Sequence, residues 1–576
     1  MKPVQSRFLL NSLVFILLMC LAMFLSMYIK HENYWDFANY HYYNAFAFLN
    51  NRLNYDIVPA SVNTFFNPII ELPLYFYIQY FNENSDLIYA LQGIWGGLTL
   101  FVFYKIYLLF FKVDNLFSWI VFGLACLFVL SGDATYTQLG SSSNELPLAF
   151  LILWGLYILL KMIKIPNTQT LKKFFFAGLL MGIALGLKQT VITYCVSAGL
   201  MLMVCYKYFN KPFKSIVWFA VGGLLGFLLI DGYFLYKYYV LYQNPFFPFL
   251  NGIFHSPYFD DSNYRDPRFL PTPATFFIWP ILWNFPGYNI KEIAYFDLRL
   301  PFVYVIFMSF LISYLYKKKL KSYFTQHPLD ASLATFIILS FFTWMAVFSI
   351  LRYSVIIEII SVIWFIKLFY WFFERKNIVF AALGCSVIVA VLLFPLFEDG
   401  LPPKSHKKTF LEVEEIKLPE NTLLKLYNFP TAFVIPEFAK HAQFRALAYK
   451  QYNCQHHEGS DFIERSLFGK MRDEISKNHK GPVVIVFLNK SLFYDQDIRK
   501  LHKKRLKCQE YKKKHSMDDE FECSFTLCRV WNSIEDAIIE EIGDNYFCRP
   551  LKNNFTNLHI CVPKELKTQI LGEEND

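Results

Sequence analysis

The chain has 576 residues, of which 55% are hydrophobic, 20% aromatic and 18% charged. This composition is too apolar for a water-soluble protein of this length, and it indicates that lipid surrounds most of the chain. A formal net charge of +9 could suit a nucleic-acid partner. Much of this charge, however, lies in short segments between apolar runs, where lysine and arginine orient a membrane protein. We therefore expect membrane lipids and no nucleic acid as partners.

The first apolar run extends from Phe8 to Ile29. Its length, about 22 residues, is enough to cross the roughly 30 Å hydrocarbon core of a bilayer. Ten more apolar runs follow, so the sequence predicts about eleven transmembrane helices. These runs lie at 87–111, 115–131, 146–160, 174–187, 190–206, 215–235, 299–316, 331–350, 353–372 and 377–396.

Basic residues fall mostly in every second connection between these runs. By the positive-inside rule, the side that carries them is cytoplasmic. The N-terminus is then inside, and an odd number of spans puts everything after about residue 397 outside. The basic residues on this side are Lys2, Arg7, Lys112, Lys161, Lys164, Lys172, Lys173, Lys207, Lys211, Lys214, Lys317, Lys318, Lys319, Lys321, Arg375 and Lys376.

Cysteine usage agrees with this topology. Five of the eleven cysteines lie in apolar runs, and an even set of six lies in the tail, residues 397–576. Disulfides persist in oxidising compartments, so we expect up to three of them in the tail. A zinc site near Cys454, His456 and His457 is the alternative, although no paired C-x-x-C spacing supports it. The tail cysteines are Cys454, Cys508, Cys523, Cys528, Cys548 and Cys561.

The tail has an α/β pattern. Strand-like runs occur at Thr431–Ile435 and Pro482–Leu488, with a helix-like stretch from Asp461 to Ser476 between them. The predicted fold is therefore an all-α polytopic membrane protein, residues 1–396, with a small C-terminal α/β domain outside the membrane, residues 397–576. A packing or acceptor-docking role suits this domain.

Two long outer loops, 30–86 and 236–298, are rich in aromatic, carboxylate and amide side chains. Long loops in compact proteins are usually functional. Phe37–Leu49 and Pro68–Tyr80 have helical length and abundant aromatic surface, so we expect them to lie in the plane of the membrane interface. Asp36 comes just after the first span. It is a candidate functional carboxylate, and a solvated helix end is the alternative.

The motifs in these loops resemble a known family. The first loop contains Trp35-Asp36 and the run Asn39–Asn44, and the second contains the run Asn244–Asn251. A first span followed at once by an aromatic loop with an acidic residue resembles the GT-C superfamily of membrane glycosyltransferases, in particular uncharacterised bacterial members. The resemblance covers roughly residues 1–400. Its further motifs are Pro59-Ala60, Phe65-Phe66-Asn67-Pro68, Leu72-Pro73, Ser256-Pro257 and Asp266-Pro267-Arg268-Phe269.

This resemblance implies an inverting transfer of sugar from a polyprenyl-phosphate carrier to a glycan, lipid or protein acceptor at the outer face of a bacterial plasma membrane. Asp36 matches the carboxylate that takes a proton from the acceptor. The departing phosphate needs cations, and the planar guanidinium of arginine can hold phosphate through two hydrogen bonds. A lysine that snorkels to the interface is the alternative for Lys188. The phosphate-binding candidates are Arg265, Arg268, Arg352 and Lys188.

Asp133, Glu145 and His41 are the candidates for a second acidic or acceptor-binding position. Glu145 also begins a predicted helix, where helix-dipole stabilisation alone would explain a carboxylate. The sequence assigns no cofactor. A divalent cation is left open. The early outer loops contain no D-x-D metal-binding motif that would indicate a required one.

Two other functions share this topology. A transporter or flippase of lipid-linked saccharide would also use many spans with buried cations, but such proteins commonly show repeated halves and broken helices. A polymerase or ligase of surface polysaccharide would join whole glycans and would also use large outer loops.

The lysine pattern and the tail cysteines together predict a cytoplasmic N-terminus and a periplasmic tail. Alkaline phosphatase fused after residue 400 should therefore be active, because that enzyme folds only outside the cytoplasm. An inactive phosphatase fusion, together with an active cytoplasmic reporter at the same position, would overturn the assignment.

Overall fold

The computed structural model describes residues 3–30, 34–261, 266, 269–283, 304, 308, 325–373, 407–449, 466–488, 538 and 540–572. The chain forms two compact units. We call the first the helical unit, and the second the sheet unit. The helical unit comprises residues 1–33, 84–234 and 265–408, and the sheet unit comprises 34–83, 235–264 and 409–576.

The helical unit contains helices long and apolar enough to cross a membrane. Five helices meet this criterion among the described residues: α1, α5, α8, α11 and α16. The predicted count of eleven is not confirmed, and runs 299–316 and 377–396 lie almost wholly outside the described residues. The elements are α1 (Pro3–Ile29), α5 (Ser85–Phe110), α6 (Leu116–Leu130), α7 (Asp133–Gln138), α8 (Glu145–Lys164), η4 (Pro166–Thr168), α9 (Leu171–Leu187), η5 (Gln189–Val191), α10 (Ile192–Val204), η6 (Tyr206–Tyr208), α11 (Pro212–Tyr242), α13 (Trp279–Leu282), α16 (Pro328–Val347), η8 (Leu351–Ser354) and α17 (Val355–Phe373).

Glycines allow two pairs of these helices to pack backbone to backbone. A Cβ added to Gly182 of α9 would lie 2.0 Å from the carbonyl oxygen of Gly223 on α11. A Cβ added to Gly222 of α11 would lie 2.0 Å from the carbonyl oxygen of Phe175 on α9. A Cβ added to Gly93 of α5 would lie 2.8 Å from the carbonyl oxygen of Ala22 on α1. Small residues that permit close approach are typical of helix pairs in lipid, where no hydrophobic effect drives association.

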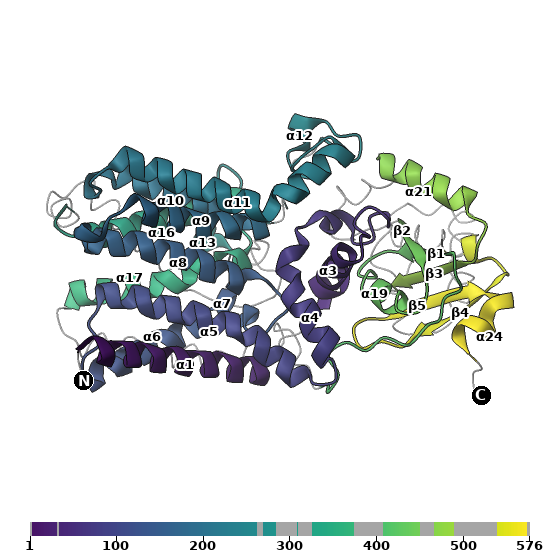
Figure 1. Cartoon of the computed structure of the whole chain (residues 1–576), viewed down its shortest axis with the longest axis horizontal. Coiled ribbons are helices and arrows are strands. Elements are labelled where there is room, and N and C mark those ends of the chain that lie inside the picture. Colours follow the sequence, from purple (N-terminus) through teal and green to yellow (C-terminus); the bar gives the residue numbers. More distant parts are fainter. Residues whose placement is uncertain are drawn as a thin grey trace, which may run out of the picture. The chain divides into compact units, whose positions relative to one another are not determined.

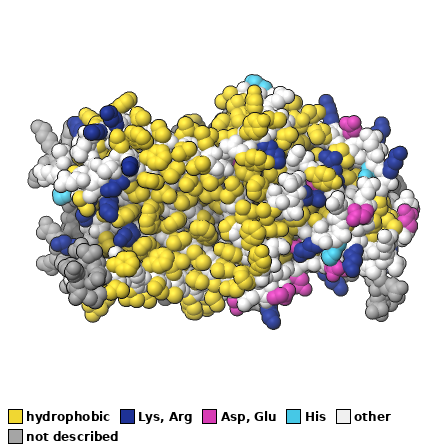
Figure 2. All heavy atoms as spheres, viewed as in Figure 1, with side chains coloured by type: hydrophobic (Ala, Val, Ile, Leu, Met, Phe, Trp, Pro, Cys, Tyr) yellow, Lys and Arg dark blue, Asp and Glu magenta, His cyan; other side chains and the backbone are white. Residues whose placement is uncertain are grey.

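The surface of the helical unit has the charge distribution of a membrane protein. Figure 2 shows a largely hydrophobic surface over its helices, with Lys and Arg side chains gathered at one end. Two basic side chains of the helical unit, Lys161 and Lys164, lie in the last turn of α8. This pattern is consistent with a membrane-embedded unit.

The sheet unit is built on a five-stranded sheet of order β2-β1-β3-β5-β4. Strands β1, β2 and β3 are parallel, and β4 and β5 are antiparallel to their neighbours. The elements are α2 (Tyr34–Asp36), η1 (Phe37–His41), α3 (Tyr42–Leu49), η2 (Ser61–Phe65), η3 (Pro68–Glu71), α4 (Leu72–Phe81), α12 (Asn251–Phe254), β1 (Thr422–Tyr427), α19 (Val434–Phe438), β2 (Phe444–Tyr449), α21 (Leu467–Asn478), β3 (Val483–Leu488), β4 (Tyr546–Leu551), β5 (Leu558–Pro563), η10 (Lys564–Leu566) and α24 (Lys567–Leu571).

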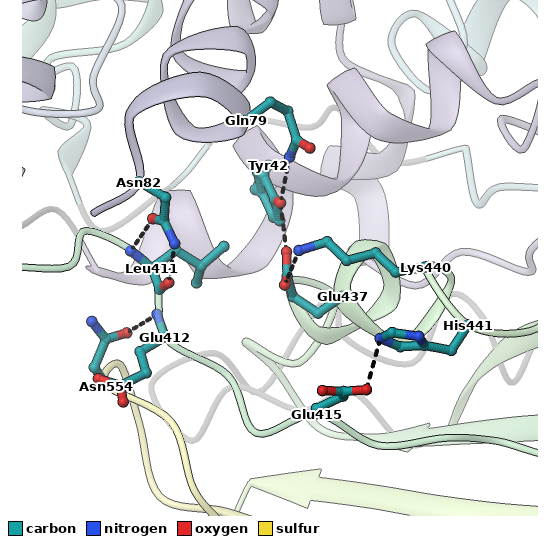
Figure 3. A network of polar contacts seen from close by, with 10 residues as sticks. All are labelled: Tyr42, Gln79, Asn82, Leu411, Glu412, Glu415, Glu437, Lys440, His441 and Asn554. Atoms are coloured by element: carbon teal, nitrogen blue, oxygen red, sulfur yellow. Dashed lines mark hydrogen bonds and ion pairs between the residues drawn. The ribbon is translucent and has the colours of Figure 1, made fainter. Parts of the chain in front are cut away.

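The first outer loop folds together with the tail in this unit, so Figure 1 shows α3 beside α19. Ile57 pairs with Leu447 as a parallel bridge, which covers the outer edge of β2. Its amide donates to the carbonyl oxygen of Ala446 at 2.9 Å. Side chains add further contacts, because the Tyr42 hydroxyl donates to the Glu437 carboxylate at 2.6 Å (Figure 3).

The start of the second outer loop also packs within the sheet unit. The ring of Phe65, from the first loop, contacts the rings of Tyr242 and Phe247, and it stacks on Phe468 of α21. The Leu467 amide donates to the carbonyl oxygen of Pro257. Aromatic side chains from three distant segments thus form one core.

Several predictions for individual segments can now be judged. The strand at Pro482–Leu488 is confirmed as β3, but the predicted strand at Thr431–Ile435 is wrong, because this segment is a turn leading into α19. A short buried apolar run does not distinguish strand from helix. Phe37–Leu49 and Pro68–Tyr80 are helical, yet residues 37–47 are buried in protein rather than presented to a membrane surface.

A disulfide in the tail is confirmed. Cys548 and Cys561 are bonded to each other across the register pair of β4 and β5. The disulfides expected at the other four tail cysteines remain a prediction, since those residues lie outside the described part of the chain. They are Cys454, Cys508, Cys523 and Cys528.

The contact between α9 and α11 predicts the effect of enlarging a glycine. Gly182→Leu should destabilise the protein by about 1–3 kcal/mol or more, the range for overpacked cores, because the new side chain must displace the backbone of α11. Gly123→Leu on α6 is the matched control, since a Cβ there meets nothing within 4 Å among the described residues. Thermal unfolding in detergent measures both. Equal melting temperatures for the two variants would contradict the close packing.

Candidate functional site

Four predicted site residues lie in the helical unit, and three of them come together. Lys188 follows the last residue of α9, and its ammonium contacts the carboxylate of Glu145, the first residue of α8, at 2.5 Å. The Lys188 ammonium also lies over the Tyr353 ring, 5.3 Å from its centre. Burial disfavours the charged lysine, but the Glu145 carboxylate outweighs this and raises the pKa of Lys188. Lys188 therefore pairs with a buried acid instead of snorkelling to solvent.

Arg352 approaches the same aromatic ring. It lies in η8, where its guanidinium carbon is 5.2 Å from the centre of the Tyr353 ring. The carbonyl oxygen of Tyr353 in turn accepts a hydrogen bond from the Tyr194 hydroxyl of α10. We call Glu145, Lys188, Arg352 and Tyr353 the ionic cluster. It brings two cations and one carboxylate to the ends of apolar helices.

Asp133 begins α7, which packs beside η8. The Glu358 carboxylate of α17 accepts hydrogen bonds from the amides of Ala134 and Thr135 at 3.0 and 2.9 Å. A Cβ at Gly132 would lie 1.8 Å from a Glu358 oxygen, so a larger residue there would displace this carboxylate. Glu358 thus holds the segment that presents Asp133, which is itself buried.

Asp36 lies in the sheet unit and is only 5% exposed, which excludes the alternative of a solvated helix end. It is the last residue of α2 and precedes a π-helical segment, Phe37–His41. Such segments are rare and frequently occur at functional sites. All five residues of this segment are buried.

His41 pairs with a carboxylate that the sequence analysis does not single out. Its Nδ1 lies 2.6 Å from an oxygen of Glu71, and both side chains are buried. A carboxylate on Nδ1 fixes the orientation of the ring. A buried pair of this kind occurs at catalytic sites and also in packed cores.

The second motif block mainly shapes its own loop. The Asn251 side chain accepts from the Ser256 amide and donates to the carbonyl oxygens of Ser256, Phe259 and Asp260. Asn244 similarly bonds Phe246 and Phe249. Arg265 and Arg268, the arginines predicted to bind phosphate from this loop, lie outside the described residues.

Sequence reasoning missed Glu71, Tyr353 and Glu358. A signal existed for Glu358 alone, because it is an acidic residue inside the apolar run 353–372, and such residues are costly in a membrane and usually functional. No local pattern links Glu71 to His41. Tyr353 becomes informative only when Lys188 and Arg352 are seen at its ring.

The described residues contain no group of three or more His, Cys, Asp and Glu side chains placed to hold a metal ion. The arrangement offers instead partly buried cations, a type of group that can stabilise an anion, and buried carboxylates, a type of group that can accept a proton. Comparison of the chain with protein-family models and with curated proteins found no match.

Proposed function

We propose that this chain is an inverting glycosyltransferase of a bacterial plasma membrane. It takes sugar from a polyprenyl-phosphate carrier and transfers it to an acceptor at the outer face. The motif resemblance suggests this chemistry, and the ionic cluster is the observation that supports it best.

Charged side chains within apolar helix bundles are expensive and usually serve function. The cationic groups of Arg352 and Lys188 both lie over the Tyr353 ring. They lie at helix ends, where a membrane-anchored phosphate can be bound. Because Glu145 already offsets the charge of Lys188, we assign the phosphate to Arg352. Its guanidinium stays protonated and can form two parallel hydrogen bonds with phosphate oxygens.

In the proposed reaction, an acceptor hydroxyl oxygen bonds to the anomeric carbon while the bond from that carbon to the phosphate oxygen breaks. The electron pair of the broken bond leaves with the phosphate. Asp36 takes the proton of the attacking hydroxyl. Asp36 is buried, so bulk water is largely excluded from its carboxylate.

Asp36→Asn should lower kcat for sugar transfer by about 10²- to 10⁴-fold, the usual contribution of a general base. KM for the donor should stay unchanged, because the carboxylate is not assigned to the phosphate. Arg352→Gln should instead raise the donor KM. The assay follows radiolabelled sugar from a defined polyprenyl-phosphate donor into acceptor, using purified full-length protein in nanodiscs. Asp86→Asn, at an exposed carboxylate, is the control.

Two results would contradict the proposal. Normal transfer by Asp36→Asn, together with loss of transfer in a folded Glu145→Gln variant, would place the base in the helical unit. Movement of intact lipid-linked sugar across the membrane without transfer would identify a flippase instead.

A further inference from the structure

We propose that the sheet unit contains a binding site for a neutral, hydroxyl-rich glycan, with the side-chain amides of Asn39 and Asn428 as its ligands. The site lies where the first outer loop covers the carboxyl ends of the parallel strands. This inference deepens the proposed function, because it assigns the chemical class of the acceptor.

The first observation is the strand order. β1 connects through α19 to β2 on one side of it, and β2 connects through α21 to β3 on the other side. The two connections therefore place strands on opposite sides of β1, so the strand order reverses there. In open α/β sheets, ligands bind outside the carboxyl ends of the strands at such a point. Asn428 is the first residue after β1. Its backbone N–H donates to the carbonyl oxygen of Tyr449 at the end of β2.

The second observation is that the first loop closes over this position. The Trp35 ring packs edge-on against the ring of Phe429, with 5.6 Å between centres. The Phe433 amide donates to the carbonyl oxygen of Ala38 at 3.1 Å. Residues just before Asn39 therefore contact residues just after Asn428. The helices that follow these two segments, α3 and α19, lie beside each other in Figure 1.

The third observation concerns the two amides themselves. Asn39 and Asn428 are each 1% exposed, and neither the oxygen nor the nitrogen of either side chain has a hydrogen-bond partner among the described residues. Buried polar groups are almost always paired, and an exception calls for an explanation. Asn39 also lies in the π-helical segment, and Asn428 has a left-handed backbone, with φ of 61°. Both features are typical of positions retained for function.

The chemistry of the surroundings identifies the ligand. A carboxamide offers one acceptor oxygen and two N–H donors, which match neighbouring sugar hydroxyls that both donate and accept. Trp35, 42% exposed, provides an aromatic face for the apolar side of a sugar ring. Residues 35–44 and 428–434 contain no lysine or arginine, and their one histidine, His41, is paired with Glu71. Within these two segments, a phosphorylated or otherwise anionic ligand would find no lysine or arginine.

Binding of neutral tetrasaccharides tests the site directly. The full-length protein in nanodiscs is titrated with maltotetraose, cellotetraose, chitotetraose and mannotetraose, and binding is followed by saturation-transfer NMR. Glucose 6-phosphate and tetraalanine are the comparison ligands. We expect at least one tetrasaccharide to bind, and Asn39→Leu and Asn428→Gly each to weaken its binding at least tenfold.

The variants are chosen to separate binding from folding. Leucine has nearly the shape of asparagine, and replacing an unpaired buried amide with it should leave the melting temperature unchanged or higher. Glycine accepts the left-handed backbone of position 428. Asn421→Gly is the matched control, because Asn421 also has a positive φ, 56°, but lies just before β1, at the opposite end of that strand. It should bind the tetrasaccharide normally.

The inference is overturned if no tetrasaccharide binds, if a comparison ligand binds in its place, or if both variants bind as the control does. A large drop in melting temperature for Asn39→Leu would also overturn it, since the amide would then be structural. Sugar-transfer activity is measured separately. Tetrasaccharide binding that depends on the two amides, without sugar transfer, would refute the proposed function alone. Sugar transfer together with tetrasaccharide binding that does not depend on the amides would refute this site alone.

Discussion

A buried carboxylate, that of Asp56, connects the first outer loop to the sheet. It accepts two hydrogen bonds from Arg52, one from the Tyr43 hydroxyl and one from the Ala446 amide on β2. Burial and the Asp56 charge raise the pKa of Tyr43, so this hydroxyl stays protonated and donates. These four hydrogen bonds offset the cost of burying the Asp56 carboxylate in the core. The pairing of Ile57 with β2 and the position of the π-helical segment both depend on this junction.

Buried charges in the helical unit also need ionic or hydrogen-bond partners. Removing one partner of a buried pair such as Lys188 with Glu145 typically costs about 3–5 kcal/mol, because the other charge is left uncompensated. Glu358 is similarly bound, through the amides of Ala134 and Thr135. Both units thus surround buried ionisable side chains with fixed donors and acceptors, an arrangement that in active sites lowers the cost of charge development.

Local properties of the fold could be predicted from the sequence, and distant pairings could not. The run 87–111 corresponds to α5, Ser85–Phe110, because a long apolar run is a local signal. The partnership of Ile57 with Leu447 joins segments 390 residues apart (447 − 57), and nothing in either segment indicates it. The candidate site shows the same division. The sequence indicates Arg352 as a phosphate-binding candidate, but only the structure shows its guanidinium at the Tyr353 ring and Glu71 beside His41. Only the structure, likewise, shows that the Asn428 side-chain amide has no hydrogen-bond partner among the described residues.

Hydrogen exchange in the full-length protein most directly tests whether the first loop and the sheet form one unit. Asp56→Ala removes the side-chain acceptor of the Ala446 amide and two of the hydrogen bonds that the Arg52 guanidinium donates, leaving the one to the carbonyl oxygen of Phe444. Exchange should therefore accelerate together in residues 53–60 and 444–449, by tenfold or more. Asp86→Ala, at an exposed ion pair of the helical unit, should change neither segment. Faster exchange confined to residues 53–60, with 444–449 still protected, would contradict the account.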